Sequence, residues 1–292
     1  MIYINIKKYL ILLIAGFFLA PSASIAKTVE LNISPKIIAT ADYKEGKLGL
    51  PAVILIHGFL QTRESPTIRH LADELASRGY TILVPTLSLG MTKRAQSLGC
   101  EAIHHHTMEE DNREIGQWVS WLTSKKYHNI VLIGHSRGGN SILSYLNGKP
   151  NQSVKKGILL SLPDDETLGD TALNRKKMIE LARQNLKKAP NELAPYKISF
   201  CDRYMATPES FLSFFDFNRN NSLNSLKTSK KPVEAIFGSK DDRMAKDWPD
   251  RLKAIGATTT VINNANHFFS DQAEFELYDV VMKSLGSLEM ER

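Results

Sequence analysis

Residues 130–139 of this 292-residue chain read IVLIGHSRGG, a short apolar run followed at once by a Gly-x-Ser-x-Gly pattern. The run Ile130–Gly134 has the length and composition of a buried β-strand, and helix-like sequence follows Gly138-Gly139. A serine in a sharp turn between a strand and a helix projects its hydroxyl at the carboxyl end of the strand, and small flanking residues let the two elements pack closely. Ser136 is therefore a candidate nucleophile. The alternative is a structural turn in which this serine has no chemical role.

Apolar runs of strand length recur along the chain, and most are continuous rather than alternating. Continuous runs are typical of strands buried on both faces of a parallel sheet. Amphipathic helical segments lie between them, one of them behind a capping box formed by Thr107 and Glu110. This alternation predicts an α/β fold with a mostly parallel sheet flanked by helices. The predicted strands are Ala52–His57, Tyr80–Val84, Ile130–Gly134, Gly157–Leu162, Val233–Phe237 and Thr258–Ile262, with one or two edge strands in Val29–Ala41.

One connection is much longer than a strand crossover requires. Seventy residues separate Leu162 from Val233, whereas a crossover needs only about a dozen or more. We expect residues 163–232 to form a cap insertion above the sheet, and a peripheral ornament is the alternative. The insertion contains a helix-like segment, Asp170–Lys188, and an aromatic segment, Phe200–Phe217. Four phenylalanines of the aromatic segment either line an acyl pocket or pack the core of the insertion: Phe211, Phe214, Phe215 and Phe217.

A serine hydroxyl becomes an effective nucleophile when a base takes its proton. Of the eight histidines, His267 follows the strand-like run Thr258–Ile262 and precedes the last helix-like segment. It therefore lies at the carboxyl end of a late strand, which is where a base facing Ser136 has to be. A histidine with no role in catalysis is the alternative.

The base in turn needs a carboxylate to orient it. The run Val233–Phe237 is followed by a glycine and then by Asp241, which places this carboxylate at the same edge of the sheet. The chain order is then Ser, Asp, His, which differs from the two other well-known triad orders. Asp242 is the main competitor for this role, and Asp164 and Asp165 are weaker ones.

Fixed backbone donors are needed for the negative charge that develops on an attacked carbonyl oxygen. One candidate is the N–H of Arg137, directly after the serine. The other is the N–H of Phe59, in the loop after Ala52–His57. We expect His57 to order that loop rather than to transfer protons.

Together these features resemble the α/β-hydrolase superfamily, and they span most of the chain from Ala52 to Leu285. The resemblance implies an eight-stranded, mostly parallel sheet with the cap inserted between its sixth and seventh strands, and acyl chemistry without a cofactor. The chain is similar to exported bacterial members, which implies fold and site but not substrate. Asn266 departs from the family pattern, because many members have glycine before the histidine. The matching motifs are His57-Gly58-Phe59, Gly134–Gly139, Gly238-x-x-Asp241 and Asn266-His267-Phe268.

The N-terminus has the order of a secretory signal peptide. Lys7 and Lys8 precede a twelve-residue apolar run, Tyr9–Ala20, and small residues follow it. The run is shorter than the roughly 20 residues that cross a bilayer. We expect residues 1–26 to be removed, which leaves a periplasmic or secreted hydrolase domain, residues 27–292, without a stable membrane anchor. An uncleaved anchor is the alternative.

Composition and charge exclude other classes of protein. Hydrophobic residues make up 42% of the chain and charged residues 23%, which is a globular rather than a disordered composition. The net charge is +6, and loss of Lys7 and Lys8 would lower it to +4. The basic residues form no stripe interleaved with aromatics, so we expect no nucleic-acid partner.

Cysteine and histidine usage bears on disulfides and metals. Cys100 and Cys201 either form a disulfide in an oxidising compartment or remain separate thiols. The three adjacent histidines His104-His105-His106 lie in a loop expected near the active site. Zinc ligands are usually separated by at least two residues, so we expect no metal there, and a polar loop before the capped helix is the simpler interpretation.

The sequence therefore predicts an exported serine hydrolase of carboxylesterase or lipase type, which cleaves an ester through an acyl-enzyme on Ser136 with help from Asp241 and His267. The expected substrate is a small-molecule or lipid-like acyl compound; thioesters and amides stay open, as does the oligomeric state. One alternative is an acyltransferase, in which an alcohol replaces water. The other is an inactive member of the fold that acts as a binding protein.

Overall fold

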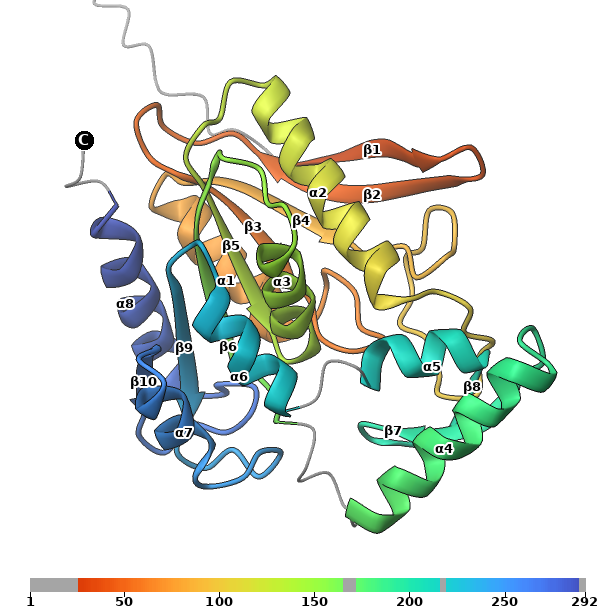
Figure 1. The fold of residues 1–292 in the computed structure, drawn as a ribbon. Helices are drawn as coiled ribbons and strands as arrows, with labels where there is room; N and C mark the ends of the chain where they lie inside the picture. Colours follow the sequence, from red (N-terminus) through yellow and green to blue (C-terminus); the bar gives the residue numbers. More distant parts are fainter. Residues whose placement is uncertain (1–25, 165–171, 216–218, 289–292) are drawn as a thin grey trace, which may run out of the picture.

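The computed structural model describes residues 26–164, 172–215 and 219–288 of the chain (Figure 1). Its central sheet has eight strands in the order β1-β2-β4-β3-β5-β6-β9-β10. The pairs β1–β2 and β2–β4 are antiparallel and all other neighbours are parallel, so the predicted α/β fold class is confirmed. The bounds are β1 Lys27–Ser34, β2 Ile37–Lys44, β3 Ala52–Ile56, β4 Thr81–Thr86, β5 Ile130–His135, β6 Val154–Leu160, β9 Val233–Gly238 and β10 Thr258–Ile262.

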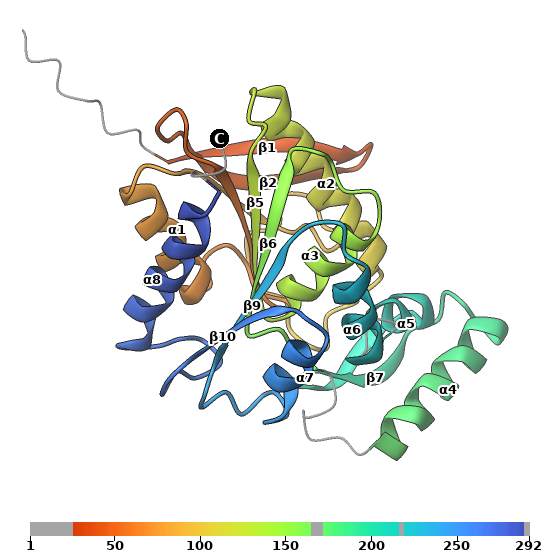
Figure 2. The same cartoon turned by 60° about the vertical axis from the view of Figure 1, so that its left-hand side comes forward.

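Helices cover both faces of this sheet (Figure 2). Successive side chains of a strand point to opposite faces, so β3 contributes Ile54 to the core on one face and Leu55 to the core on the other. The first core receives α2 (Met108–Ser124) and α3 (Arg137–Asn147), and the second receives α1 (Pro66–Ser77) and α8 (Ala273–Gly286). Because both faces are buried, the strands need continuous apolar sequence, which explains the pattern used to predict them.

The start of α2 confirms the predicted capping box. The hydroxyl oxygen of Thr107 accepts from the backbone N–H of Glu110, and the Glu110 carboxylate accepts from the backbone N–H of Thr107 at 2.9 Å. These bonds satisfy two backbone donors that a helix start leaves without partners, and such a cap stabilises a helix by about 1 kcal/mol. The cap fixes where α2 begins, directly after the loop of three histidines.

The insertion lies between β6 and β9, the sixth and seventh strands of the sheet along the chain, as the resemblance implied. Two of its aromatic rings, Tyr196 and Phe211, stack with centroids 4.2 Å apart, and Phe215 lies 4.5 Å from Phe211. Phe211 and Phe215 therefore pack inside the insertion. Phe217 lies outside the described residues. The elements are α4 Ala172–Lys188, β7 Ala194–Ile198, β8 Cys201–Ala206, α5 Pro208–Phe215 and α6 Arg219–Thr228, with β7 and β8 forming an antiparallel hairpin.

The loop between β4 and α2 holds this hairpin against the main body of the protein. A disulfide joins Cys100 of the loop to Cys201 at the start of β8. The backbone N–H of His104 donates to Met205 at 2.9 Å, and that of Thr207 donates to His104 at 3.1 Å. The loop is therefore part of the interface that carries the insertion.

The three adjacent histidines of that loop, His104, His105 and His106, differ in burial. His104 is buried and stacks on Tyr204 with centroids 4.1 Å apart, and His106 is buried against Phe214 at 5.3 Å. Only His105 is exposed. The histidines do lie in a loop before the capped helix, as predicted, and the insertion buries two of the three.

Two predictions concern the membrane and the N-terminus. Over the described ranges, no helix is both long and apolar enough to cross a bilayer. The predicted signal peptide occupies residues 1–26, of which 1–25 lie outside the described residues, so it stays a prediction.

The C-terminal part of the described chain contains two helices after β9. Helix α7 (Trp248–Ala254) connects β9 to β10, and α8 follows β10.

Candidate active site

Ser136 lies in the tight turn between β5 and α3, with φ 53° and ψ −125°. A positive φ is unfavourable for a residue with a side chain, and such strain occurs mostly at functional positions. Two glycines make the turn possible. A Cβ on Gly134 would lie 2.5 Å from the carbonyl oxygen of Gly138, and a Cβ on Gly138 would lie 2.5 Å from the carbonyl oxygen of His57. The pattern Gly-x-Ser-x-Gly is thus a steric requirement of this turn.

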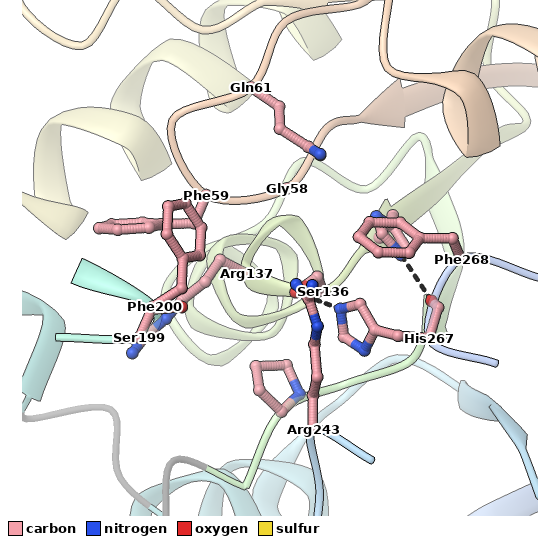
Figure 3. A pocket seen from close by; sticks show the side chains of 12 residues that line it. Gly58, Phe59, Gln61, Ser136, Arg137, Ser199, Phe200, Arg243, His267 and Phe268 are labelled. Atoms are coloured by element: carbon pink, nitrogen blue, oxygen red, sulfur yellow. Dashed lines mark hydrogen bonds between the residues drawn. The ribbon is translucent and has the colours of Figure 1, made fainter. Parts of the chain in front are cut away.

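The structure brings the three predicted catalytic side chains together from three loops at the carboxyl edge of the sheet. The Nε2 atom of His267 lies 3.0 Å from Oγ of Ser136, as the dashed line in Figure 3 shows. On the other side of the ring, Nδ1 of His267 lies 2.9 Å from Oδ2 of Asp241. A hydroxyl, an imidazole and a carboxylate form one hydrogen-bonded chain, which is the arrangement that activates a serine.

Of the competing carboxylates, Asp242 and Asp164 belong to the described residues, and neither takes the place of Asp241 beside His267. Asp242 is exposed, whereas the side chain of Asp241 is only 1% exposed. Asp164 is buried and accepts from the backbone N–H of Ala245 at 2.8 Å, so it holds the loop after β9 instead. Asp165 lies outside the described residues. Of the predicted candidates that the structure describes, Asp241 is the one in position to orient the imidazole.

Buried neighbours hold the loop that carries His267. His135 Nε2 lies 2.9 Å from the carbonyl oxygen of His267, and Ser161 Oγ donates to the same oxygen at 2.9 Å. A carbonyl oxygen only accepts, so the Nε2 of His135 carries the proton. Burial, followed by the nearby His267, lowers the pKa of His135 to about 3, so this ring is neutral at ordinary pH. His135 thereby supports the loop without competing for the serine proton.

Asn266, the residue that departs from the family pattern, also has a structural role. Its side-chain oxygen accepts from the backbone N–H of Phe268 at 2.9 Å and from that of Ser270 at 3.2 Å. An Asn side chain that accepts from backbone N–H groups ahead of it forms a local turn. The asparagine therefore shapes the turn that presents His267, and its presence is compatible with the site.

The two residues predicted to supply oxyanion donors lie in the cleft of the predicted nucleophile. Phe59 and Arg137 line the same cleft as Ser136 and His267 (Figure 3). The backbone N–H of Phe59 donates to no acceptor in the part of the chain that the structure describes. A backbone N–H left available beside a nucleophile is what stabilisation of an oxyanion needs.

His57 orders the loop that carries Phe59, as predicted. Its Nδ1 lies 2.9 Å from the carbonyl oxygen of Gly58, and its Nε2 accepts from the backbone N–H of Leu87 at 3.0 Å. Burial, followed by the positive charge of Arg94, lowers the pKa of His57 to about 3. Both ring nitrogens are thus engaged in holding backbone, and this histidine has no free lone pair for a substrate proton.

Arg94 was not among the sequence candidates, yet it holds the same loop. Its guanidinium donates to the carbonyl oxygens of Leu87 at 2.7 Å and of Gln61 at 2.6 Å. A third bond goes to the carbonyl oxygen of Gln96 at 2.9 Å. Burial lowers its pKa to about 10, which still leaves the group charged at neutral pH. The backbone N–H of Gln61 donates to the carbonyl oxygen of Gly58 at 3.2 Å, so Arg94 holds the far end of the turn that carries Phe59.

Ser136 lines a small cleft that is open to solvent. Two of its lining residues, Ser199 and Phe200, come from the turn between β7 and β8, so the insertion does reach the site. Phe214, one of the four predicted pocket phenylalanines, lines a neighbouring small pocket together with Phe59 and Arg137 instead. The residues lining the cleft are Gly58, Phe59, Gln61, His135, Ser136, Arg137, Pro163, Ser199, Phe200, Arg243, His267 and Phe268.

Sequence reasoning missed several of these lining residues. Arg243 could have been found, because it lies two residues after Asp241 in a loop already assigned to the sheet edge. Ser199 and Phe200 carry no such signal, since their place over the site depends on how the hairpin packs. Among the described residues, no group of three His, Cys, Asp or Glu side chains is arranged to hold a metal.

Known proteins similar to this chain share its α/β-hydrolase fold. The model of a family described as "Alpha/beta hydrolase family" matches residues 53–280. No curated protein matches the sequence significantly. Similar solved structures include Est1E from Butyrivibrio proteoclasticus, with 18% identity and a TM-score of 0.59, covering 90% of this chain and 99% of that one. A monoacylglycerol lipase from Paleococcus ferrophilus has 17% identity, a TM-score of 0.63 and coverages of 90% and 99%. The hydrolase GrgF from Penicillium sp. sh18 has 14% identity, a TM-score of 0.68 and coverages of 91% and 98%.

Proposed function

This chain belongs to the alpha/beta hydrolase family, and from that premise we propose that it is a serine hydrolase that cleaves carboxylic esters through an acyl-enzyme on Ser136. The hydrogen-bonded chain from Ser136 through His267 to Asp241 carries the proposal. It gives a nucleophile, a base and a group that orients the base, each within hydrogen-bond distance of the next.

In the first half of the reaction, Nε2 of His267 takes the proton of Ser136 as Oγ attacks the ester carbonyl carbon. The carbonyl oxygen becomes negatively charged and accepts from the backbone N–H groups of Phe59 and Arg137. Asp241 stabilises the imidazolium that forms. His267 then gives its proton to the alkoxy oxygen, the alcohol leaves, and the acyl group stays on Ser136.

In the second half, water enters the position that the alcohol has left. His267 takes a proton from this water, the hydroxide attacks the acyl carbon, and a second oxyanion forms at the same donors. Collapse returns the proton to Oγ of Ser136 and releases the carboxylic acid. The enzyme is regenerated and no cofactor takes part.

The similar structures support a small acyl substrate. Est1E was solved with ferulic acid bound, and another neighbour is named as a monoacylglycerol lipase. These likenesses support a carboxylic ester of a small-molecule or lipid-like acid for this chain. An acyltransferase would use the same acyl-enzyme with an alcohol in place of water, and added alcohols would then divert the product from acid to ester.

We also propose that the protein is exported, with residues 1–26 acting as a cleaved signal peptide. The disulfide between Cys100 and Cys201 supports an oxidising compartment. Mass spectrometry of the protein recovered from a periplasmic or secreted fraction is expected to give a chain that begins at Lys27. An intact N-terminus in that fraction would contradict the cleavage.

A fluorophosphonate probe tests the proposed nucleophile. The wild-type protein and a Ser120→Ala control are expected to be labelled, because Ser120 lies on the exposed surface of α2. The Ser136→Ala variant is expected to remain folded by circular dichroism and to take no label. If the folded wild-type protein were not labelled at all, the binding-protein alternative would replace the enzyme.

A further inference from the structure

We propose that the substrate carries a negatively charged group within a few bonds of the scissile carbonyl, and that the guanidinium of Arg243 binds it. This inference rests on the proposed function and narrows the class of ester. The cleft beside Ser136 carries a positive charge that the catalytic mechanism does not use.

The loop after β9 fixes the position of Arg243 at the site. Its backbone N–H donates to Oδ1 of Asp241 at 2.9 Å, so its backbone is tied to the carboxylate that orients His267. Its guanidinium lies over the ring of Phe268, 4.8 Å from the centroid. Figure 3 shows the side chain extending from this loop toward Ser136. A stacked guanidinium loses little further freedom when it binds a ligand.

The described residues that line the cleft include arginines but no acidic side chain that could neutralise them. The cleft lining includes the two basic residues Arg137 and Arg243, and no Asp or Glu of the described residues lines it. The nearest catalytic carboxylate, Asp241, is buried behind His267 and already bonded to it. An anionic group of the substrate would supply the missing negative charge next to the reacting atoms.

Arg243 and Arg137 differ in what their side chains already contact. The Arg137 guanidinium is buried, lies over the Phe59 ring and donates to the carbonyl oxygen of Phe214 at 3.4 Å. The guanidinium of Arg243 is partly exposed and makes no hydrogen bond or ion pair with the described residues. Its five N–H donors form a fork that matches a carboxylate, sulfate or phosphate. The ligand-binding role is therefore assigned to Arg243.

Two pairs of esters, whose members differ by one added carboxylate, test this assignment and locate the charge. On the acyl side, the pair is p-nitrophenyl butyrate and mono-p-nitrophenyl glutarate. On the leaving-group side, it is phenyl acetate and 4-acetoxybenzoate, with 4-acetoxyphenyl phosphate distinguishing a phosphate from a carboxylate. The enzymes compared are the wild type, Arg243→Gln and a control, Arg78→Gln, which removes an exposed guanidinium paired with Glu74 on α1.

The expected result is a change confined to the anionic esters. Arg243→Gln should lower kcat/KM for the anionic member of one pair by about 10- to 100-fold, the usual range for a hydrogen bond to a charged group. It should leave the neutral member within about twofold, since the substitution keeps the backbone N–H that binds Asp241. Arg78→Gln should leave both members unchanged, and Arg243→Lys should recover part of the loss.

Contrary outcomes separate this proposal from the proposed function. If neutral and anionic esters are hydrolysed and Arg243→Gln affects both members of each pair equally, the charge assignment is overturned while the serine hydrolase stands. Equal loss in Arg78→Gln would overturn it too, because a general effect of net charge would explain the result. If the wild type hydrolyses no ester and takes no fluorophosphonate label, both proposals fall together.

Discussion

Replacing Gly138 by alanine tests the steric account of the nucleophile turn. A Cβ at this position would lie 2.5 Å from the carbonyl oxygen of His57 and 2.6 Å from that of Ile56, whereas ordinary contacts begin at 3.4 Å. Both obstacles are backbone atoms. The start of α3 and the end of β3 therefore have to separate by about 0.9 Å, the difference between 3.4 and 2.5 Å. Overpacking of this kind costs roughly 1–3 kcal/mol. At about 2–4 °C per kcal/mol for a domain of this size, Tm should fall by roughly 2–12 °C.

The same displacement should reduce activity, because His57 leads directly into the loop that carries the Phe59 N–H. A misplacement of about 1 Å at a catalytic group lowers the rate by roughly 100-fold. We therefore expect a loss of that order in kcat/KM, together with the lower Tm, when thermal unfolding and ester hydrolysis are measured on one preparation.

Gly139→Ala is the matched control. Its Cβ would meet the side-chain Cδ1 of Leu162 at 3.3 Å and the carbonyl oxygen of Gly134 at 3.5 Å, and the leucine can move. Alanine in a helix is favoured over glycine by about 1 kcal/mol, so this variant should not lose Tm. Its kcat/KM should stay within about threefold of the wild-type value. The steric reasoning fails if Gly138→Ala unfolds and reacts like the wild type, or if both variants lose activity equally.

Three further predictions concern the acid, the disulfide and the buried histidines. Asp241→Asn should lower kcat by about three to four orders of magnitude because the His267 tautomer is lost, and Asp242→Asn should cost less than threefold; a larger loss in Asp242→Asn by ester assay would reverse the assignment. The cysteines are 101 residues apart in the chain, so replacing both by serine should reduce the free energy of unfolding by roughly 2–5 kcal/mol, seen in urea titrations, and reductant should then have no further effect on the double variant. Unchanged stability would contradict a disulfide in solution. Burial lowers the pKa of three histidines to about 3 from an ordinary value of 6.5. As pH falls from about 6.5 toward 3, the unfolded chain gains protons that these rings do not take up in the fold, so each ring disfavours the folded state by up to about 1.4 kcal/mol per pH unit. Their imidazole resonances in NMR should not move between pH 8 and pH 5, and titration near pH 6.5 would contradict their burial; these rings are His57, His106 and His135.

Local patterns made the fold and the hydrogen-bonded triad predictable from the sequence. The turn at Ser136 is set by glycines four residues apart, and strands buried on both faces need continuous apolar runs. His267 and Asp241 each follow such a strand, and parallel strands end at one edge of the sheet. Their proximity therefore follows from topology, without knowledge of side-chain packing.

The contacts that hold the loops around the triad in place were not predictable from the sequence. Arg94 and Gln61 are 33 residues apart in sequence and meet only because two loops pack together. The burial of His104 by Tyr204 likewise depends on how the insertion folds back on the main body. Apolar periodicity predicts where such segments begin and end, but it contains no information on which of them come into contact.

A direct measurement of the central claim is to locate the acyl group on the protein. The enzyme is mixed with a p-nitrophenyl ester, quenched in acid within milliseconds and digested with trypsin, which releases the peptide Tyr127–Arg137. The account predicts that this peptide gains the mass of one acyl group on Ser136, and that Ser136→Ala forms no adduct and no p-nitrophenol above background. Ester hydrolysis by Ser136→Ala at the wild-type rate, or an acyl group on another residue, would contradict it.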